Sequence, residues 1–266
     1  MHRLLLSIII AVASLCASCE AARQDQSPVR LLFVGNSLTY VGNLPAVLDA
    51  LAASNGKSVQ SDMIVKGGAT LTERVADGSV GRALAARHYD YVVLQERGGD
   101  IICAFGPTSC KDAGASLQAL AHVATAHGAK PILLGTYQAM PQVSAALVAA
   151  ESAAASRLSM AYLPVSNRFQ AAIGSAPAAE WLDVDHAHPG HDLVLLEAVL
   201  LYRELFSTLP EPGGFSVHAP MYRPSAKFSM PSPTSHGVAS KDFAPAHAYT
   251  AARVGIVLAI AGDGRH

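Results

Sequence analysis

Residues 29–37 read VRLLFVGNS, a short apolar run that ends in a glycine turn and a serine. A run of this length and composition, residues 29–34, is typical of a strand that is buried on both faces. Similar short runs recur along the chain, with helical segments between them. We expect the other strands at residues 59–65, 91–94, 131–134 and 162–165. We expect helices at residues 44–53, 79–87, 113–127, 143–160 and 193–206.

This alternation of strands and helices predicts an α/β fold with a mostly parallel, five-stranded sheet covered by helices on both faces. In such sheets ligands bind outside the carboxyl ends of the strands. The composition fits a folded chain, since 51% of the 266 residues are hydrophobic and 15% are charged. The 19 basic and 20 acidic residues are scattered and give a net charge of -1, so we expect no nucleic-acid partner.

The first 22 residues have the order of a secretory signal peptide. Arg3 supplies the positive start, residues 4–15 (LLLSIIIAVASL) form the apolar core, and small residues follow in CASCEAA. The apolar run is shorter than the roughly 20 residues that a membrane span needs. Cys19 resembles a lipoprotein processing site, and ordinary cleavage near residues 19–22 is equally consistent. We therefore expect an exported protein, either periplasmic, extracellular or lipid-anchored at Cys19 to the outer side of a bacterial membrane.

Two further segments are defined by composition. Residues 28–209 hold all the expected strands and form the predicted domain, and residues 210–266 are rich in Pro, Gly, Ser and Ala. We expect this extension to be irregular and either packed on the domain or partly disordered, with the apolar stretch 254–261 against the body. Cys103 and Cys110 lie in a loop-like stretch; a disulfide and two free thiols both remain open.

Three expected strand ends carry groups that suit acyl-transfer chemistry. Ser37 follows the first strand, where its hydroxyl is either an exposed nucleophile or a helix cap. Gly67 and Gly68 end the second strand, where a glycine lets a backbone N–H approach an oxyanion closely. Gln95 ends the third strand, and its amide is a candidate for a further oxyanion donor. Each of these features taken alone is also common in ordinary turns.

The segment WLDVDHAHPGHD, residues 181–192, supplies a candidate general base. Asp185 and His188 are three residues apart, so the carboxylate can hold the imidazole Nδ1–H and leave Nε2 to accept a proton from serine. Asp183 and His186 form an overlapping pair with the same spacing, but Pro189 favours the second pair. The same Asp/His cluster at 183–191 also suits a metal site. We expect histidines outside it, His247 among them, to be surface or capping residues.

These motifs resemble those of a known family, the SGNH/GDSL hydrolases. FVGNSLTY, with Gly35, Asn36 and Ser37, is similar to the first block of that family, and the D-x-x-H-P pattern from Asp185 is similar to its last block. The resemblance covers residues 31–206. It implies a flavodoxin-like three-layer fold, a triad of Ser37, His188 and Asp185, and ester hydrolysis without a metal or other cofactor.

The resemblance also implies an oxyanion hole, and here this chain departs from the family pattern. The donors would be the N–H groups of Ser37 and Gly68 together with a side-chain amide. The third block usually presents an asparagine, whereas this chain has Gln95 in a strand-ending LQE, which is similar to a subgroup of the family. The expected activity is hydrolysis of a short acyl ester, such as an acetyl group on a carbohydrate. The alternatives are a metal-dependent hydrolase and a non-catalytic carbohydrate-binding protein.

Overall fold

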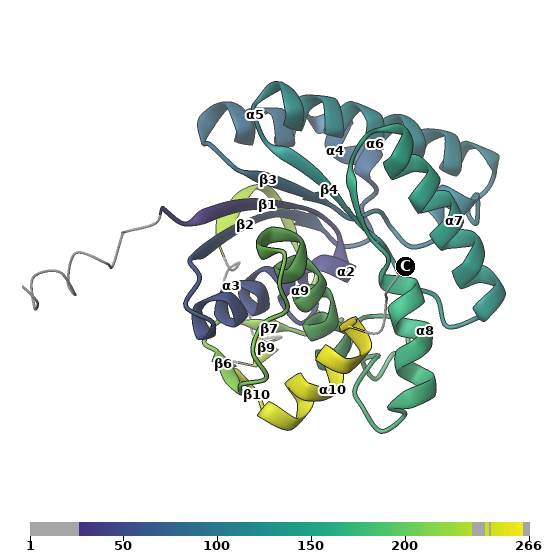
Figure 1. Ribbon diagram of the computed structural model, residues 1–266. Coiled ribbons are helices and arrows are strands. Elements are labelled where there is room, and N and C mark those ends of the chain that lie inside the picture. The colour runs from purple at the N-terminus through teal and green to yellow at the C-terminus, as the bar shows by residue number, and fades with distance from the viewer. Residues whose placement is uncertain (1–26, 236–242, 245, 263–266) are drawn as a thin grey trace, which may run out of the picture.

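β1 (Val29–Gly35) lies inside the main sheet, where it pairs in parallel with β2 (Val59–Lys66) on one side and β3 (Tyr91–Leu94) on the other. The computed structural model describes residues 27–235, 243–244 and 246–262. β4 (Lys130–Leu134) and β5 (Ala161–Leu163) extend the sheet, so that five parallel strands run in the order β5-β4-β3-β1-β2. The predicted α/β fold with its parallel sheet is therefore confirmed (Figure 1).

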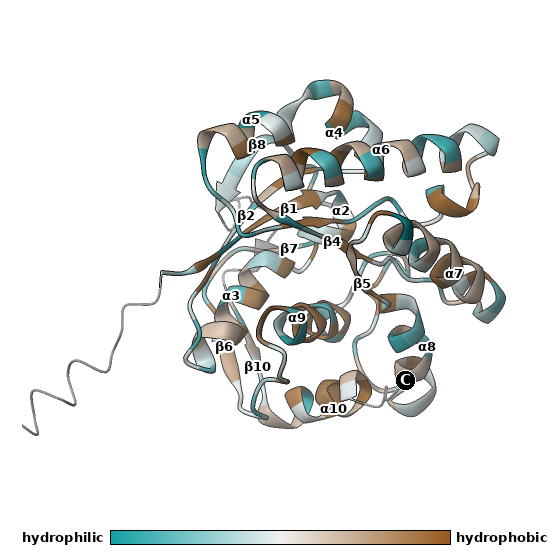
Figure 2. Ribbon diagram, turned by 45° about the horizontal axis from the view of Figure 1, so that its top comes forward, coloured by the Kyte–Doolittle hydropathy of each residue, from teal (hydrophilic) through white to brown (hydrophobic). Residues whose placement is uncertain are grey.

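Helices cover both faces of the sheet, because alternate residues of each strand point to opposite cores. Leu31 and Phe33 of β1 pack into one core, and Leu32 and Val34 pack into the other. The first core is covered by α3 (Leu44–Ser54), α8 (Val165–Ser175), α9 (His191–Phe206) and α10 (Ala251–Gly262). The second is covered by α4 (Leu71–Asp77), α5 (Ser79–Ala86) and α6 (Pro107–Ala126), with α7 (Pro141–Arg157) beside β5. Figure 2 shows α9 in the middle of its layer, between α3, α8 and α10.

The C-terminal extension contributes a sixth strand to the main sheet. β8 (Ser229–Ser235) pairs antiparallel with β2 at the sheet edge. Its sequence, SMPSPTS, does not predict a strand, because proline is tolerated in strands chiefly at edges and bulges. The pairing is irregular between Met63 and Val65, opposite the part of β8 that carries Pro231 and Pro233.

The rest of the extension is also ordered into short elements. β6 (Phe215–Val217) pairs with β10 (His247–Tyr249), and β7 (Met221–Tyr222) pairs with β9 (Phe243–Ala244). α10 buries the predicted apolar stretch, including Val254 and Val257, and packs against α9. Where it is described, the extension therefore completes the sheet and one helical layer instead of forming an irregular cover.

Several helices begin or end at residues that lie outside any clear periodic pattern. α2 (Ser37–Tyr40), α4 and α8 were not predicted; the first two are four and seven residues long. α6 begins at Pro107, six residues before the expected start, because proline is well suited to the first turn of a helix. Cys103 and Cys110 form a disulfide across this start, which resolves the alternative that the sequence left open.

The predicted signal segment and lipid-anchor residue Cys19 lie outside the described residues. Within the residues that the structure does describe, no helix is both long enough and apolar enough to cross a bilayer.

Candidate active site

Ser37 is held at the sharp turn between β1 and α2. Asn36 caps the helix: its Oδ1 accepts the Leu38 N–H at 3.0 Å, and its Nδ2 donates to the Ala69 carbonyl at 3.2 Å. The capping role therefore falls to Asn36. The partly exposed Ser37 hydroxyl makes no hydrogen bond to other described residues. A Cβ at Gly35 would collide with Thr39 Oγ1, so the tight strand-to-helix turn requires glycine there.

Asp185 and His188, the predicted pair, are joined by their side chains. His188 Nδ1 lies 2.6 Å from Asp185 Oδ2, while Asp185 Oδ1 accepts the backbone N–H groups of Ala187 and His188, each at 3.0 Å. Burial raises the pKa of Asp185, but these hydrogen bonds outweigh it and lower the pKa to about 2. The carboxylate is therefore ionised at neutral pH and can fix the orientation of the imidazole.

The overlapping pair, Asp183 and His186, does not form a comparable contact. Asp183 Oδ1 accepts the Val184 N–H at 2.6 Å, and His186 is linked to Asp183 only through the backbone. His186 adopts a left-handed conformation with φ of 56°. These contacts form the turn that presents Asp185 and His188. Asp183 and His186 therefore shape the turn, and Asp185 and His188 are the pair joined by their side chains.

Other members of the Asp/His cluster point to separate partners. The rings of His191 and His247 stack with their centroids 3.7 Å apart, and Asp192 pairs with Arg253. Burial lowers the pKa of His191 and lowers that of His247 to about 4. His247 was predicted to be a surface or capping residue, and its stacking corrects that. Across the described ranges, no three His, Cys, Asp or Glu side chains converge as metal ligands would.

Backbone N–H groups on two strand ends remain free to donate. Among the described residues, neither the Ser37 N–H nor the Gly68 N–H has a hydrogen-bond partner. Gly68 is exposed, with φ of 69°, and no atom lies within 4 Å of the position of a Cβ. Gly67 donates its N–H to the Phe228 carbonyl at 3.0 Å and is excluded as the alternative donor. Of the two glycines, Gly68 is the one that suits an oxyanion hole.

Gln95 lies beneath the Ser37 turn and is only 1% exposed. Its Oε1 accepts the Thr39 hydroxyl at 2.6 Å, and its Nε2 donates to Glu197 Oε1 at 3.3 Å. These bonds tie β3 to α2 and α9. The second N–H of the amide has no hydrogen-bond partner among the described residues, and oxyanion donation by Gln95 stays a prediction.

A buried polar layer continues from Gln95 towards the His188 turn. Glu197 is fully buried on α9, and burial raises its pKa well above the ordinary value. Burial, then the charges of Glu197 and Asp185, raise the pKa of Tyr137, whose hydroxyl donates to the Ala187 carbonyl at 2.9 Å. Thr39, Tyr137 and Glu197 were missed from the sequence. Of the three, Glu197 could have been recognised in the sequence, because it is a single carboxylate in the apolar run LVLLEAVLLY.

No protein-family model and no curated protein matches the sequence. Among solved structures, a protein from Slackia heliotrinireducens, provisionally assigned to the SGNH hydrolases, matches 67% of this chain and 100% of its own. It is 27% identical, with a TM-score of 0.55. The chain therefore resembles an SGNH hydrolase in its fold and, at 27% identity, in its sequence.

Two further solved structures share the fold of this chain. TesA matches 67% of this chain and 98% of its own at 21% identity, with a TM-score of 0.52. An acetyl xylan esterase from Geobacillus stearothermophilus matches 70% of this chain and 98% of its own at 16% identity, with a TM-score of 0.53. A hydrolase with this fold agrees with the position of Ser37 at the end of β1.

Proposed function

We propose that this protein is a serine esterase that removes a short acyl group, in particular acetyl, from a carbohydrate. The observation that carries the proposal is the 2.6 Å contact between His188 Nδ1 and the ionised Asp185 carboxylate. This contact fixes the tautomer in which Nε2 can act as a base. Ser37, the predicted nucleophile, lies at the carboxyl end of β1 in a turn where no described residue bonds to its hydroxyl.

The reaction proceeds in two steps through an acyl-enzyme. His188 accepts the hydroxyl proton as Ser37 Oγ attacks the ester carbonyl, and the Ser37 and Gly68 N–H groups bind the oxyanion. His188 then donates that proton to the leaving alcohol as the ester C–O bond breaks. In the second step His188 activates water, which displaces Ser37 from the acyl group and releases the acid. Asp185 stabilises the imidazolium in both steps.

The positions of two cavities bear on the length of the acyl group. A cavity of about 250 Å³ lies beside the His188 turn, lined partly by Asp183, His191 and Arg223. A larger cavity of about 620 Å³, lined mainly by apolar side chains, lies between α8 and α10, and Ser37, Gly68 and His188 do not line it. A long acyl chain would need an apolar channel that begins at Ser37.

The test compares p-nitrophenyl acetate with the butyrate and octanoate esters on the wild type and on Ser37→Ala. We expect the acetate to give the highest kcat/KM, and Ser37→Ala to lower its hydrolysis on the order of 10⁴- to 10⁶-fold. Ser175→Ala is the matched control, since among the described residues the Ser175 hydroxyl bonds only to the Ala171 carbonyl of its own helix. Full esterase activity in Ser37→Ala would overturn the proposal.

Export remains part of the proposal and rests on residues 1–22 alone. The substrate would then be an ester outside the cytoplasm, such as an acetylated polysaccharide. Measuring the mass of the mature protein from its native host would distinguish an intact N-terminus, simple cleavage and a lipid-modified Cys19.

A further inference from the structure

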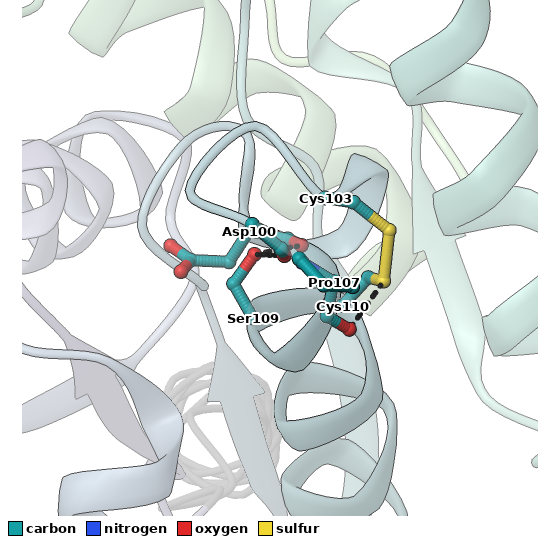
Figure 3. Close-up of a disulfide and its surroundings, with 6 residues drawn as sticks. Asp100, Cys103, Pro107, Ser109 and Cys110 are labelled. Carbon is teal, nitrogen blue, oxygen red and sulfur yellow. Dashed lines mark hydrogen bonds between the residues drawn. A yellow bond between two sulfur atoms is a disulfide. The ribbon is translucent and has the colours of Figure 1, made fainter.

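The loop between β3 and α6 presents an aromatic ring to solvent beside the proposed active site. Phe105 is 56% exposed and lies in the segment between Cys103 and Cys110. Figure 3 shows the disulfide that closes this segment. The guanidinium carbon of Arg97 lies over this ring, 4.0 Å from its centroid. An exposed aromatic ring held in place by its neighbours is a surface on which the apolar face of a ligand can pack.

The support beneath Phe105 is rigid. Arg97 makes two hydrogen bonds to the carboxylate of Asp100, both 2.9 Å long, and Asp100 is only 3% exposed. The Ser109 hydroxyl donates to the Asp100 carbonyl at 3.3 Å, which ties the loop to the start of α6 (Figure 3). Two bonds in a planar fork fix the guanidinium more firmly than a single contact would.

A cavity of about 240 Å³ opens between this loop, α6 and the segment after β2. Its lining includes Thr70, which follows Ala69, the residue whose carbonyl accepts the Asn36 amide. It also includes Glu96, the neighbour of Gln95. Thr70 is thus two residues after Gly68 in the chain, and Ala69 between them is bonded to Asn36, the neighbour of Ser37. Pockets for drug-sized ligands are about 300–1,000 Å³, so this one suits a single ring.

The charges of the cavity favour a neutral ligand. Glu96, Asp100 and Asp112 line the cavity together with one guanidinium, that of Arg97, whose fork is already bound to Asp100. An anion would meet a surplus of carboxylates. A cation is also disfavoured, because the guanidinium of Arg97 already lies over the ring of Phe105 and would repel a second positive charge there.

Hydrogen-bonding groups at the cavity are free to bind hydroxyls. The Thr70 and Thr108 hydroxyls and the exposed Asp112 carboxylate line it and make no hydrogen bond to other described residues. Glu96 accepts the backbone N–H groups of Leu71 and Arg97 and so belongs to the wall. An apolar ring face beside free donors and acceptors matches a sugar, which has C–H groups on its faces and hydroxyls around its edge.

We infer that this cavity is a subsite for one neutral sugar ring of the ester substrate. The ring packs on Phe105, and Thr70, Thr108 and Asp112 bind its hydroxyls, while the ester it carries reaches Ser37. The disulfide holds Phe105 in position. This inference rests on the proposed function, because it places the carbohydrate part of the substrate of that same site.

The test measures selectivity as the ratio of kcat/KM for a partly acetylated xylooligosaccharide to kcat/KM for p-nitrophenyl acetate. We expect Phe105→Ala to lower this ratio about tenfold, which is typical of one lost apolar contact. Replacing both Cys103 and Cys110 by serine should lower it in the same direction. Ile256→Ala is the matched control, because Ile256 is another exposed apolar side chain, 40% exposed, on α10. Its ratio should equal that of the wild type.

Binding without turnover separates this inference from the proposed function. Saturation-transfer NMR on Ser37→Ala with xylotetraose, which carries no ester, should show contact that Phe105→Ala removes from the double variant. An unchanged selectivity ratio, or xylotetraose binding that persists without Phe105, would overturn the subsite. Saturation by choline in a Phe105-dependent way would also overturn it, in favour of a cation site. Failure of the wild type to hydrolyse p-nitrophenyl acetate would refute the proposed function and leave the binding result standing.

Discussion

Gln95 occupies the position at which the SGNH pattern has an asparagine, and its longer side chain extends into the protein core. It meets Thr39 and Glu197 in the core, where an unpaired polar group is strongly unfavourable. From the sequence alone Gln95 was expected to be a strand-end amide facing the crevice. The environment of a side chain depends on the elements packed around it, and the partner Glu197 lies 102 residues away.

Replacing Gln95 by alanine should therefore have two effects. The Thr39 hydroxyl and the Glu197 carboxyl lose a partner, which should lower the free energy of unfolding by about 1–3 kcal/mol. If the remaining amide N–H binds the oxyanion, kcat should also fall by about 10²- to 10³-fold. Urea denaturation and steady-state kinetics on p-nitrophenyl acetate measure the two effects separately.

Thr39→Val is the control for this prediction, since it breaks one bond to Gln95 and leaves the amide nitrogen in place. It should lower stability with little effect on kcat. Equal losses of kcat in both variants would show that Gln95 only positions the Ser37 turn. A Gln95→Ala enzyme with wild-type kcat would remove Gln95 from the oxyanion hole.

At the level of elements, the strands and the long helices could be predicted because each has its own periodic or apolar signal. The ends of β1, β2 and β3 are at the expected places, and so the region holding Ser37 and Gly68 could be located in advance. The Asp185–His188 pair is local, within one turn, and its spacing together with Pro189 predicted it. The layer of Thr39, Gln95, Glu197 and Tyr137 joins four elements, and no local pattern encodes such contacts.

α7 shows how a buried carboxyl can join a helix to the sheet. Glu151 accepts the N–H and hydroxyl of Thr136, after β4, and the hydroxyl of Tyr162 in β5. It is 3% exposed, and burial, despite these hydrogen bonds, raises its pKa from 4.5 to about 7. The folded protein therefore holds a proton on Glu151 at pH values where the unfolded chain has released it.

This shift predicts how stability depends on pH. Below pH 4.5 both states are protonated and Glu151 contributes no penalty. As pH rises towards 7 the unfolded chain binds fewer protons, so the free energy of unfolding falls, by about 3 kcal/mol for this residue. Above the folded pKa the loss is complete. Urea denaturation at pH 5 and pH 8 should show that Glu151→Gln loses less stability over this range than the wild type.

The exposed Glu204 on α9 supplies the matched control, and Glu204→Gln should show the wild-type difference between the two pH values. Glu96 has a similarly raised pKa of about 7. The free energy of unfolding of Glu151→Gln should therefore still fall between pH 5 and pH 8, but by less than that of the wild type. An equal fall in the free energy of unfolding in Glu151→Gln and the wild type would contradict the raised pKa of Glu151.

At the scale of the whole molecule, the C-terminal extension belongs to the core. Tyr222 and Phe228 pack edge-on against Tyr40 of α2, whose hydroxyl donates to the Ala226 carbonyl at 2.8 Å. The Phe228 carbonyl also accepts the Gly67 N–H, next to the proposed oxyanion donor Gly68. The SGNH structures described above match about two thirds of the chain, whereas these contacts connect the extension directly to the Ser37 and Gly68 turns.

A chain that ends at Leu209 should therefore fail to fold cooperatively. It loses β8 from the sheet edge and α10 from α9, including the buried Val254, Val257 and Ile260. Burial of each such side chain contributes about 1.5–3 kcal/mol, and three together approach the total stability of a typical domain, about 5–15 kcal/mol. Thermal denaturation followed by circular dichroism should show no sharp transition, whereas a chain ending at residue 262 should melt like the full chain. A cooperative, active protein ending at Leu209 would show instead that the parallel sheet and its helices are stable alone, with the extension added to an already complete SGNH fold.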